Sequence, residues 1–404
     1  MHRLLAFFVA ACLCASAEDW PQFLGPRRDG SFSGEISTAW PKEGPTRVWQ
    51  KDIGPGFAGP AVDENKVFIF YRSGNEEKLD CLETKTGKAI WSSAYPTAYR
   101  DDFGFDPGPR SVPTIADGRV FTYGADGMIS GINATNGTPL WRVDAKKEFD
   151  SKKGWFGRSC APLVINGLVL VNVGGQNGAG IVALDVATGK IRWKASDDEA
   201  SYSSPTLAVF DGKTNALFVT RHNFVSVDPS TGKILFQYPF GPTENASVTA
   251  ATPLLNGNSV FLSGCYGAGS TALRIENEKP VKIWASSETM LNHYATCVHR
   301  GDLLFGFDGR QEQGPAFACV DWKTGQSLWR KESFGAGSAI IAGNNILILS
   351  ETGELILIEA SASAYKELQR AQVLGSGGRA YPALADGFYY ARDKNKLICL
   401  DLRK

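Results

Sequence analysis

One short phrase returns along almost the whole chain and constrains the fold more than any other feature of the sequence. In its clearest copy, ALDVATGKIRW, an apolar run ends at an acidic residue, a Thr-Gly turn follows, and a tryptophan stands four residues after the glycine. An eighth copy is divided between the ends of the chain, because LICLDLRK stops before its aromatic strand and Trp49 has no phrase before it. Eight copies of one phrase indicate a repeat architecture. The seven complete copies end at Trp91, Trp141, Trp193, Phe236, Trp284 and Trp329, with a degenerate copy around Tyr365.

Each repeat has the pattern of four short strands. In the third repeat the runs 160–165, 168–173, 181–186 and 190–195 are separated by Asn-Gly, a glycine-rich hairpin and Thr-Gly. Glycine supplies the positive φ angles that tight turns between antiparallel strands require. The aromatic endpoints are 36 to 52 residues apart, about the length of one four-stranded blade. We therefore predict an all-β, eight-bladed β-propeller with no long helix, in which residues 360–372 are part of a degenerate repeat.

We expect the two ends of the chain to close the ring. Pairing the strand around Trp49 with residues 395–402 completes the eighth blade and closes the ring. The propeller then occupies residues 46–404 as a single domain, after an N-terminal extension at 18–45. The aromatic residue of each phrase offers a large flat surface that can lie against the turn of the neighbouring blade. The expected docking residues are Trp49, Trp91, Trp141, Trp193, Phe236, Trp284, Trp329 and Tyr365.

The first 17 residues, MHRLLAFFVAACLCASA, have the layout of a secretory signal peptide with cleavage before Glu18. We therefore expect an exported, periplasmic protein. The alternative is a lipid-anchored envelope protein, because Val9 to Cys12 resembles a lipobox. The apolar run is too short to span a bilayer, and we expect no transmembrane segment. The six cysteines that follow the signal are scattered, and we expect them to be buried free thiols.

Charge and motifs exclude several function classes. The 42 basic and 42 acidic residues balance, and no basic block suggests nucleic acid as a partner. The three histidines after the signal do not show HxH or HxxxH spacing, so we predict no metal site. The sequence contains no GxSxG elbow and no P-loop, and we assign no catalytic residue. We expect a monomer.

The A-x-D-x-x-T-G-K-x-x-W pattern resembles the tryptophan-docking repeat of the PQQ-like (quinoprotein-type) eight-bladed propellers, over nearly all of the chain after the signal. Residues 19–30 and 99–113 are also similar to segments of secreted bacterial members of this group. The resemblance implies one of two branches. Some members are quinone-dependent dehydrogenases, and others are cofactor-free scaffolds similar to the propeller lipoprotein of the outer-membrane β-barrel assembly machinery.

The resemblance also implies what a dehydrogenase of this family would need. That branch stacks its quinone between a tryptophan and a vicinal disulfide, with calcium held by carboxylate and amide groups and with an aspartate base. This chain has no Cys-Cys pair and no long inter-blade insertions, and no calcium-binding set can be matched to it residue by residue. We therefore expect a non-catalytic scaffold that binds an envelope protein or a ligand without a cofactor. The alternative is an oxidoreductase, dependent on PQQ with calcium or otherwise using the channel mouth, that acts on an alcohol or a sugar.

Any ligand site is expected where the loops entering the innermost strands ring one mouth of the central channel. Arginines, carboxylates and aromatic rings at this mouth suit an anionic ligand, a sugar or a peptide. The alternative is that these side chains satisfy one another as a polar rim. Asp101 and Asp102 could form a pair of bases, but adjacent strand residues point to opposite faces. The candidate residues are Arg100, Asp101, Asp102, Arg110, Arg158, Tyr202, Asn245, His293, Tyr294 and Arg379, and the same segments carry Asp106, Trp155, Glu244 and Tyr381.

Overall fold

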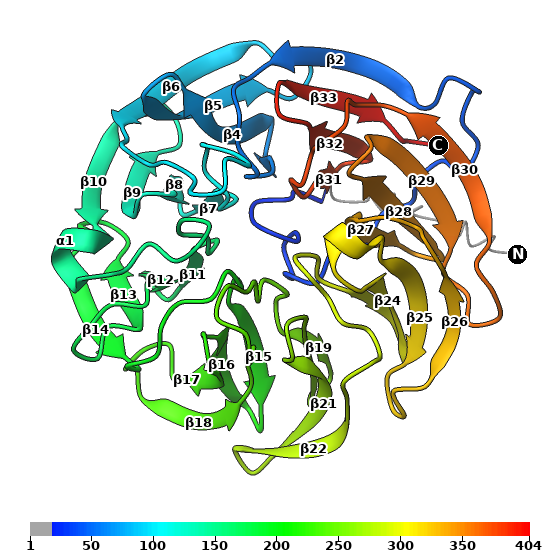
Figure 1. Ribbon diagram of the computed structural model, residues 1–404. Helices are drawn as coiled ribbons and strands as arrows, with labels where there is room; N and C mark the ends of the chain where they lie inside the picture. The colour runs from blue at the N-terminus through cyan, green and yellow to red at the C-terminus, as the bar shows by residue number, and fades with distance from the viewer. Residues whose placement is uncertain (1–17) are drawn as a thin grey trace, which may run out of the picture.

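A computed structural model describes residues 18–404, so the expected signal peptide and Cys12 lie outside the described residues. Eight blades of four antiparallel strands stand around a central channel, and in six of them the innermost strand has only three residues (Figure 1). The predicted all-β, eight-bladed propeller is therefore confirmed. The short helix α1 (Ala145–Phe149) and the 3-10 turn η1 (Gln311–Gln313) are the helical segments among these residues, and neither was expected.

The first four blades follow one another along the chain, and each runs from its innermost to its outermost strand. Their strands are β3 (Ala61–Asp63), β4 (Lys66–Ser73), β5 (Glu76–Glu83) and β6 (Ala89–Pro96); β7 (Thr114–Ala116), β8 (Arg119–Tyr123), β9 (Met128–Asn133) and β10 (Pro139–Asp144); β11 (Leu163–Ile165), β12 (Leu168–Asn172), β13 (Ile181–Asp185) and β14 (Ile191–Ala195); and β15 (Thr206–Phe210), β16 (Lys213–Val219), β17 (Asn223–Val227) and β18 (Ile234–Pro239).

The other four blades repeat this order, and the last one takes its outermost strand from the beginning of the propeller domain. Their strands are β19 (Leu254–Asn256), β20 (Ser259–Gly264), β21 (Gly269–Glu276) and β22 (Lys279–Ser286); β23 (Val298–Arg300), β24 (Leu303–Asp308), β25 (Ala316–Asp321) and β26 (Ser327–Lys331); β27 (Gly337–Ala342), β28 (Asn345–Ser350), β29 (Glu354–Glu359) and β30 (Glu367–Gln372); and β31 (Ala383–Ala385), β32 (Phe388–Arg392), β33 (Lys396–Asp401) and β2 (Thr46–Asp52).

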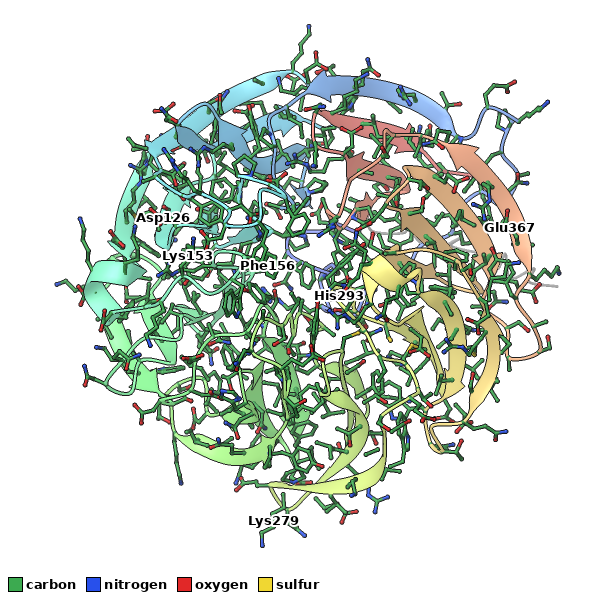
Figure 2. The ribbon with its side chains drawn as sticks, in the orientation of Figure 1. Asp126, Lys153, Phe156, Lys279, His293 and Glu367 are labelled. Carbon is green, nitrogen blue, oxygen red and sulfur yellow. The ribbon has the colours of Figure 1, made fainter. Side chains whose placement is uncertain are left out.

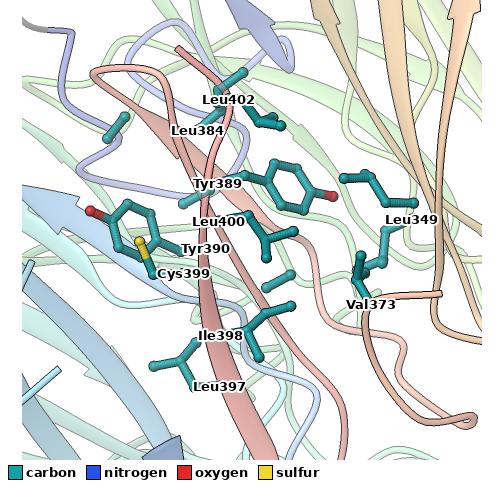
Figure 3. Packing of buried hydrophobic residues seen from close by; sticks show 14 of the residues in the cluster. Leu349, Val373, Leu384, Tyr389, Tyr390, Leu397, Ile398, Cys399, Leu400 and Leu402 are labelled. Carbon is teal, nitrogen blue, oxygen red and sulfur yellow. The ribbon is translucent and has the colours of Figure 1, made fainter. Parts of the chain in front are cut away.

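Pairing of β2 with β33 closes the ring, as the sequence predicts (Figure 1). Trp49 lies opposite Cys399, and Thr46 lies opposite Asp401. Apolar side chains then continue the core from this closing blade into its neighbour. In Figure 3, Tyr389 and Leu400 of the closing blade face Leu349 of the seventh blade. The six cysteines of the described chain are free and buried, which confirms the expectation from their spacing.

The recurring phrase joins one blade to the next. Within the third blade Asp185 accepts hydrogen bonds from the backbone amides of Ala187 (3.0 Å) and Thr188 (2.9 Å), which fixes the turn. Trp193 at the end of the phrase is buried, and its indole Nε1 donates to the carbonyl of Pro229 in the turn of the fourth blade at 3.0 Å. Five further tryptophans do the same: Trp49, Trp91, Trp141, Trp284 and Trp329 donate to the carbonyls of Thr84, Ala134, Val186, Trp322 and Ser361.

Glycine in the receiving turn makes room for the indole ring. Gly232 has a φ of +74°, and a Cβ placed on it would lie 2.5 Å from the ring of Trp193. The glycine of one phrase is therefore needed by the tryptophan of the preceding phrase. The same close approach occurs at Gly87, Gly137, Gly189 and Gly325.

One expected docking residue is assigned wrongly. Tyr365 lies in the turn that receives Trp329, with the two ring centres 6.0 Å apart, and does not project into the eighth blade. The sheet register shows why: Gln369 pairs with Leu357 as Trp329 pairs with Cys319. The docking position of the seventh phrase is therefore residue 369, four positions after Tyr365, and it holds glutamine instead of an aromatic residue. Phe236 holds the expected place in the fourth blade and is buried.

The N-terminal extension crosses the ring instead of lying on its outside (Figure 1). Trp20 pairs with Val62 of the first blade, and the carbonyl of Pro21 accepts from the amide of Ile115 in the second blade at 2.8 Å. Further along, β1 (Ser31–Phe32) pairs in parallel with β27 of the seventh blade. The segment therefore links innermost strands on different sides of the channel.

Arg28 fixes the middle of this segment. The residue is 3% exposed, and its Nη1 donates to the carbonyls of Pro205 (2.8 Å) and Ala161 (3.3 Å). Its Nη2 donates to the carbonyl of Pro162 and reaches Thr114 Oγ1 at 3.4 Å. Burial lowers the pKa of the guanidinium to about 10. One side chain thus binds the second, third and fourth blades together at one end of the channel.

Candidate functional site

A cavity of about 550 Å³ lies at the mouth of the channel, above the N-terminal segment. Its wall is mainly aromatic, with three arginines and one carboxylate. Phe156 and His293 lie on either side of the centre of the ring (Figure 2). The lining residues are Phe23, Phe57, Phe103, Phe105, Arg110, Ser111, Val112, Phe156, Ser159, Ala161, Tyr202, Ser204, Val248, Ala250, Tyr266, His293, Tyr294, Arg310, Gln311, Glu312, Arg379 and Tyr381.

Five of the ten candidate residues line this cavity, so the structure has a cavity at the position where the sequence predicts a site. These are Arg110, Tyr202, His293, Tyr294 and Arg379. They come from the loops that enter the innermost strands of the second, fourth, sixth and eighth blades.

The other five candidates lie behind or beside the wall. Asp101 binds Arg110, and the exposed Asp102 binds Lys153 at 2.6 Å, so the two aspartates do not act as a pair. Both belong to a loop and not to a strand, so strand geometry is the wrong reason for their separation. Arg158 is buried beside a separate cavity of about 170 Å³. Arg100 and Asn245 contribute carbonyl groups, which accept from Lys153 Nζ and Trp155 Nε1.

Sequence reasoning missed the part of the wall that comes from other loops. In an up-and-down blade, the hairpin between the second and third strands lies at the same end as the loop that enters the first strand. Tyr266 belongs to such a hairpin in the fifth blade, and Arg310 and Glu312 belong to one in the sixth. Counting this second set of loops would have found them, whereas no sequence signal places Phe23 of the N-terminal segment.

Arg110 and Arg379 share one aromatic ring. Each guanidinium carbon lies 5.5 Å from the centre of the Phe57 ring, a distance that allows a cation–π interaction. Arg110 is held by Asp101 at 2.9 Å, and Arg379 is held through Nε by Glu351 at 2.9 Å. Arg379 also lies 5.4 Å from the ring centre of Phe105. Two fixed cations therefore stand among ring faces on one side of the cavity.

His293 is held in its neutral form on the other side. Its Nδ1 accepts from the backbone amide of Gln311 at 3.1 Å, and its Nε2 lies 2.9 Å from the hydroxyl of Tyr266. Burial, with Arg379 and Arg310 nearby, lowers the pKa of His293 to about 4, although Glu312 acts in the opposite direction. A neutral ring whose Nδ1 accepts carries its proton on Nε2 and donates it to the Tyr266 oxygen.

Glu351 stands behind the wall and connects three of its residues. It accepts from the hydroxyl of Tyr294 at 2.9 Å and from Gln311 Nε2 at 2.6 Å, and it pairs with Arg379. Burial and the Glu351 carboxylate raise the pKa of Tyr294 well above its ordinary value. Tyr294 therefore stays protonated and serves as a donor that orients Glu351.

Large apolar side chains stand exposed on the rim above the cavity. Phe103 is 48% exposed, Phe105 is 45% exposed and Trp155 is 43% exposed. The ring of Phe103 is stacked 4.9 Å from that of Phe156 and lies 6.4 Å from that of Trp155. We call Phe103, Phe105, Trp155 and Phe156 the aromatic rim. Such a group on a water-exposed surface marks a place for binding.

The chemistry of the site does not fit the quinone and calcium of the dehydrogenase branch. Glu312 is the one carboxylate in the wall, and it is engaged by Arg310 at 2.7 Å. Across residues 18–404, no group of three or more His, Cys, Asp or Glu side chains is placed to hold a metal ion. The sequence also contains no adjacent cysteines to stack against a quinone.

Comparison with known proteins finds relatives of this chain among outer membrane protein assembly factors. The family model for the outer membrane protein assembly factor BamB matches residues 34–152 and 104–331. The chain is 24% identical to BamB of Xanthomonas campestris pv. campestris, over 64% of this chain and 63% of that protein, so it spans less than two thirds of that relative. It is 25% identical to BamB of Burkholderia pseudomallei, over 84% of this chain and 83% of that protein.

Solved structures show the same fold at low identity. BamB of Moraxella catarrhalis superposes with a TM-score of 0.66 at 14% identity, covering 88% of this chain and 99% of that one. The quinohemoprotein alcohol dehydrogenase of Comamonas testosteroni also gives a TM-score of 0.66, at 16% identity, covering 96% of this chain and 81% of that one. No helix in residues 18–404 is both long and apolar enough to cross a membrane. On the extent of the family match, this chain belongs to the BamB family of PQQ-like β-propellers.

Proposed function

We propose that this protein is a non-catalytic scaffold on the periplasmic side of the outer membrane, where it binds a component of the machinery that assembles outer membrane proteins. The observation that carries the proposal is the aromatic rim, a cluster of exposed rings displayed by the rigid ring at one mouth of the channel. The names of the BamB relatives supply the process, and the described residues offer no cluster of metal-ligating side chains to support the oxidoreductase alternative.

Aromatic side chains suit this role because they dominate the energy of protein interfaces. Truncating a central aromatic anchor commonly costs 2 kcal/mol or more, roughly a 30-fold loss of affinity. Phe103 and Trp155 come from the loops that enter the second and third blades, so a partner protein that covers both residues contacts both blades. The pair Asp102 and Lys153 lies beside the rim and adds opposite charges to its edge.

Site-specific photocrosslinking in living cells tests the proposal. A photoreactive residue at Phe103 is expected to capture an outer membrane protein assembly component, whereas the same residue at Val209 is not. Val209 is 63% exposed but lies near the far end of β15, away from the mouth. Replacing Phe103, Phe105 and Trp155 together by serine should abolish co-purification of that component with unchanged thermal unfolding. Capture at Val209 alone, or undiminished co-purification of the triple variant, would contradict the proposal.

The oxidoreductase alternative has its own test. The purified protein is titrated with PQQ in the presence and absence of calcium, and tryptophan fluorescence is followed. Since the site offers no metal-ligand set, we expect no calcium-dependent, saturable quenching. Micromolar binding that requires calcium would favour the oxidoreductase.

A further inference from the structure

The N-terminal segment forms part of the floor of the cavity at the channel mouth. Phe23 of the N-terminal segment forms part of the cavity lining, and its ring meets that of Tyr381 edge to face at 4.8 Å. Below it, Arg28 closes the gap between blades by binding backbone carbonyls. A ligand therefore enters from the mouth and stops at an apolar floor, as in a small-molecule pocket.

The guanidinium group of Arg379 can donate further hydrogen bonds. Its Nε lies 2.9 Å from a carboxylate oxygen of Glu351, and within residues 18–404 its two terminal nitrogens donate no hydrogen bond. Its side chain is 25% exposed, and the guanidinium lies among the rings of Phe57, Phe105 and Tyr294. An arginine held by one nitrogen, with its two terminal nitrogens unpaired, presents the planar fork that matches a carboxylate.

Arg110 reinforces this side of the cavity. Its side chain is 8% exposed and is fixed by Asp101, the carbonyl of Gly108 (2.8 Å) and the carbonyl of Asp106 (3.1 Å). Because Arg110 and Arg379 both lie against Phe57, their guanidinium carbons are separated by no more than twice 5.5 Å. The carboxylate partners of the two arginines, Asp101 and Glu351, are not part of the lining, so the cavity itself presents the guanidinium groups to a ligand carboxylate.

The opposite side of the cavity has both members of an ion pair in its lining. Arg310 lies over the Tyr266 ring at 4.1 Å and is paired with Glu312. Because neutral His293 donates to the Tyr266 oxygen, the Tyr266 hydroxyl keeps its own hydrogen available for a ligand. This side can therefore accept a neutral polar group, whereas Glu312 disfavours a second negative charge.

From these contacts we infer that the cavity at the channel mouth is a metal-independent pocket for a small aromatic carboxylate. The carboxyl group of the ligand binds Arg379, and its ring lies between the phenylalanines of the wall. The cavity of about 550 Å³ is large enough for a two-ring compound. This inference does not rest on the scaffold role, although Phe103, Phe105 and Phe156 belong both to the aromatic rim and to the cavity lining.

Calorimetric titration with 2-naphthoate in the presence of EDTA tests the inference. We expect saturable binding by the wild-type chain, roughly tenfold weaker binding by Arg379→Gln because the charged hydrogen bonds are lost, and unchanged binding by Arg192→Gln. Arg192 is a matched control, because it is an exposed arginine on the outer strand β14 that also pairs with a carboxylate.

A second ligand and a second variant complete the experiment. 2-Naphthalenemethanol has the same rings without the carboxyl group and should bind at least as weakly as 2-naphthoate binds to Arg379→Gln. Phe105→Ser, at a half-exposed position, should weaken 2-naphthoate binding without affecting the fold. The inference is overturned by absence of saturable 2-naphthoate binding at millimolar concentration, by equal binding of the alcohol, or by equal binding to Arg379→Gln. If Arg379→Gln does not fold, Phe105→Ser and the alcohol still decide the result.

Discussion

The fit between Gly232 and Trp193 makes a quantitative prediction about how the blades are held together. Gly232→Ala introduces a methyl group 2.5 Å from an indole carbon and places alanine at a φ of +74°. The backbone strain alone costs about 1 kcal/mol. Displacing the ring adds about 1 to 3 kcal/mol of overpacking and loosens the hydrogen bond to Pro229, which is worth about 1 kcal/mol. The expected total is about 2 to 5 kcal/mol.

Gly212 is a matched control for the backbone term. Its φ is +76°, but a Cβ on it would meet nothing within 4 Å. Gly212→Ala should therefore cost only about 1 kcal/mol. Trp193→Ala should cost about 3 to 5 kcal/mol through loss of the buried indole. In the Trp193→Ala background, Gly232→Ala should cost no more than Gly212→Ala does.

Urea unfolding followed by circular dichroism measures these free energies, provided that the slopes of the transitions agree. The double variant of Gly232 and Trp193 should be less destabilised than the sum of the two single variants by about 2 kcal/mol. Equal costs for Gly232→Ala and Gly212→Ala, or simple additivity of Gly232→Ala and Trp193→Ala, would refute the docking explanation.

Three further predictions concern ring closure and buried charge. Deleting residues 395–404 removes β33, which pairs with both β2 and β32, and should shift the whole urea transition instead of detaching one blade. Because the pKa of His293 is lowered to about 4, its contribution to stability is present above pH 6.5 and is lost as the pH falls toward 4. The wild type should lose roughly 3 kcal/mol more than His293→Gln over that range. Burial raises the pKa of Glu77, which is fully buried, so its stabilising effect should decline as the pH rises through that pKa, and Glu77→Gln should lack this decline in unfolding experiments.

The sequence was sufficient for the architecture because the relevant signals are local and repeated. Asp185, Gly189 and Trp193 lie within nine residues of one another, and each copy confirms the others. Where the phrase has decayed, as around Tyr365, the number of blades was still predicted correctly but the aromatic position was not.

The site was predictable only in part, because side chains in equivalent repeats do not have equivalent surroundings. Arg110 and Arg158 both precede a serine at the entry to an innermost strand. Arg110 reaches the cavity, whereas Arg158 is captured by the carbonyl groups of Ser151 and Asp126 and is buried elsewhere. Which loop carbonyls lie within reach is decided by tertiary packing. The floor formed by Phe23 and Arg28 occurs once in the chain and carries no repeated signal.

The closure of the ring also sets an order of events for biogenesis. Thr46 pairs with Asp401, 355 positions later, and the hydrogen-bond acceptors of Arg28 lie on three separate blades. Contacts so distant in sequence carry a large loop-closure cost and slow folding. Until the last strand is made, β2 has no partner, and its unpaired edge is open to aggregation. Because the ring is closed by a strand near the end of the chain, we expect the protein to be most prone to aggregation before β33 has paired with β2.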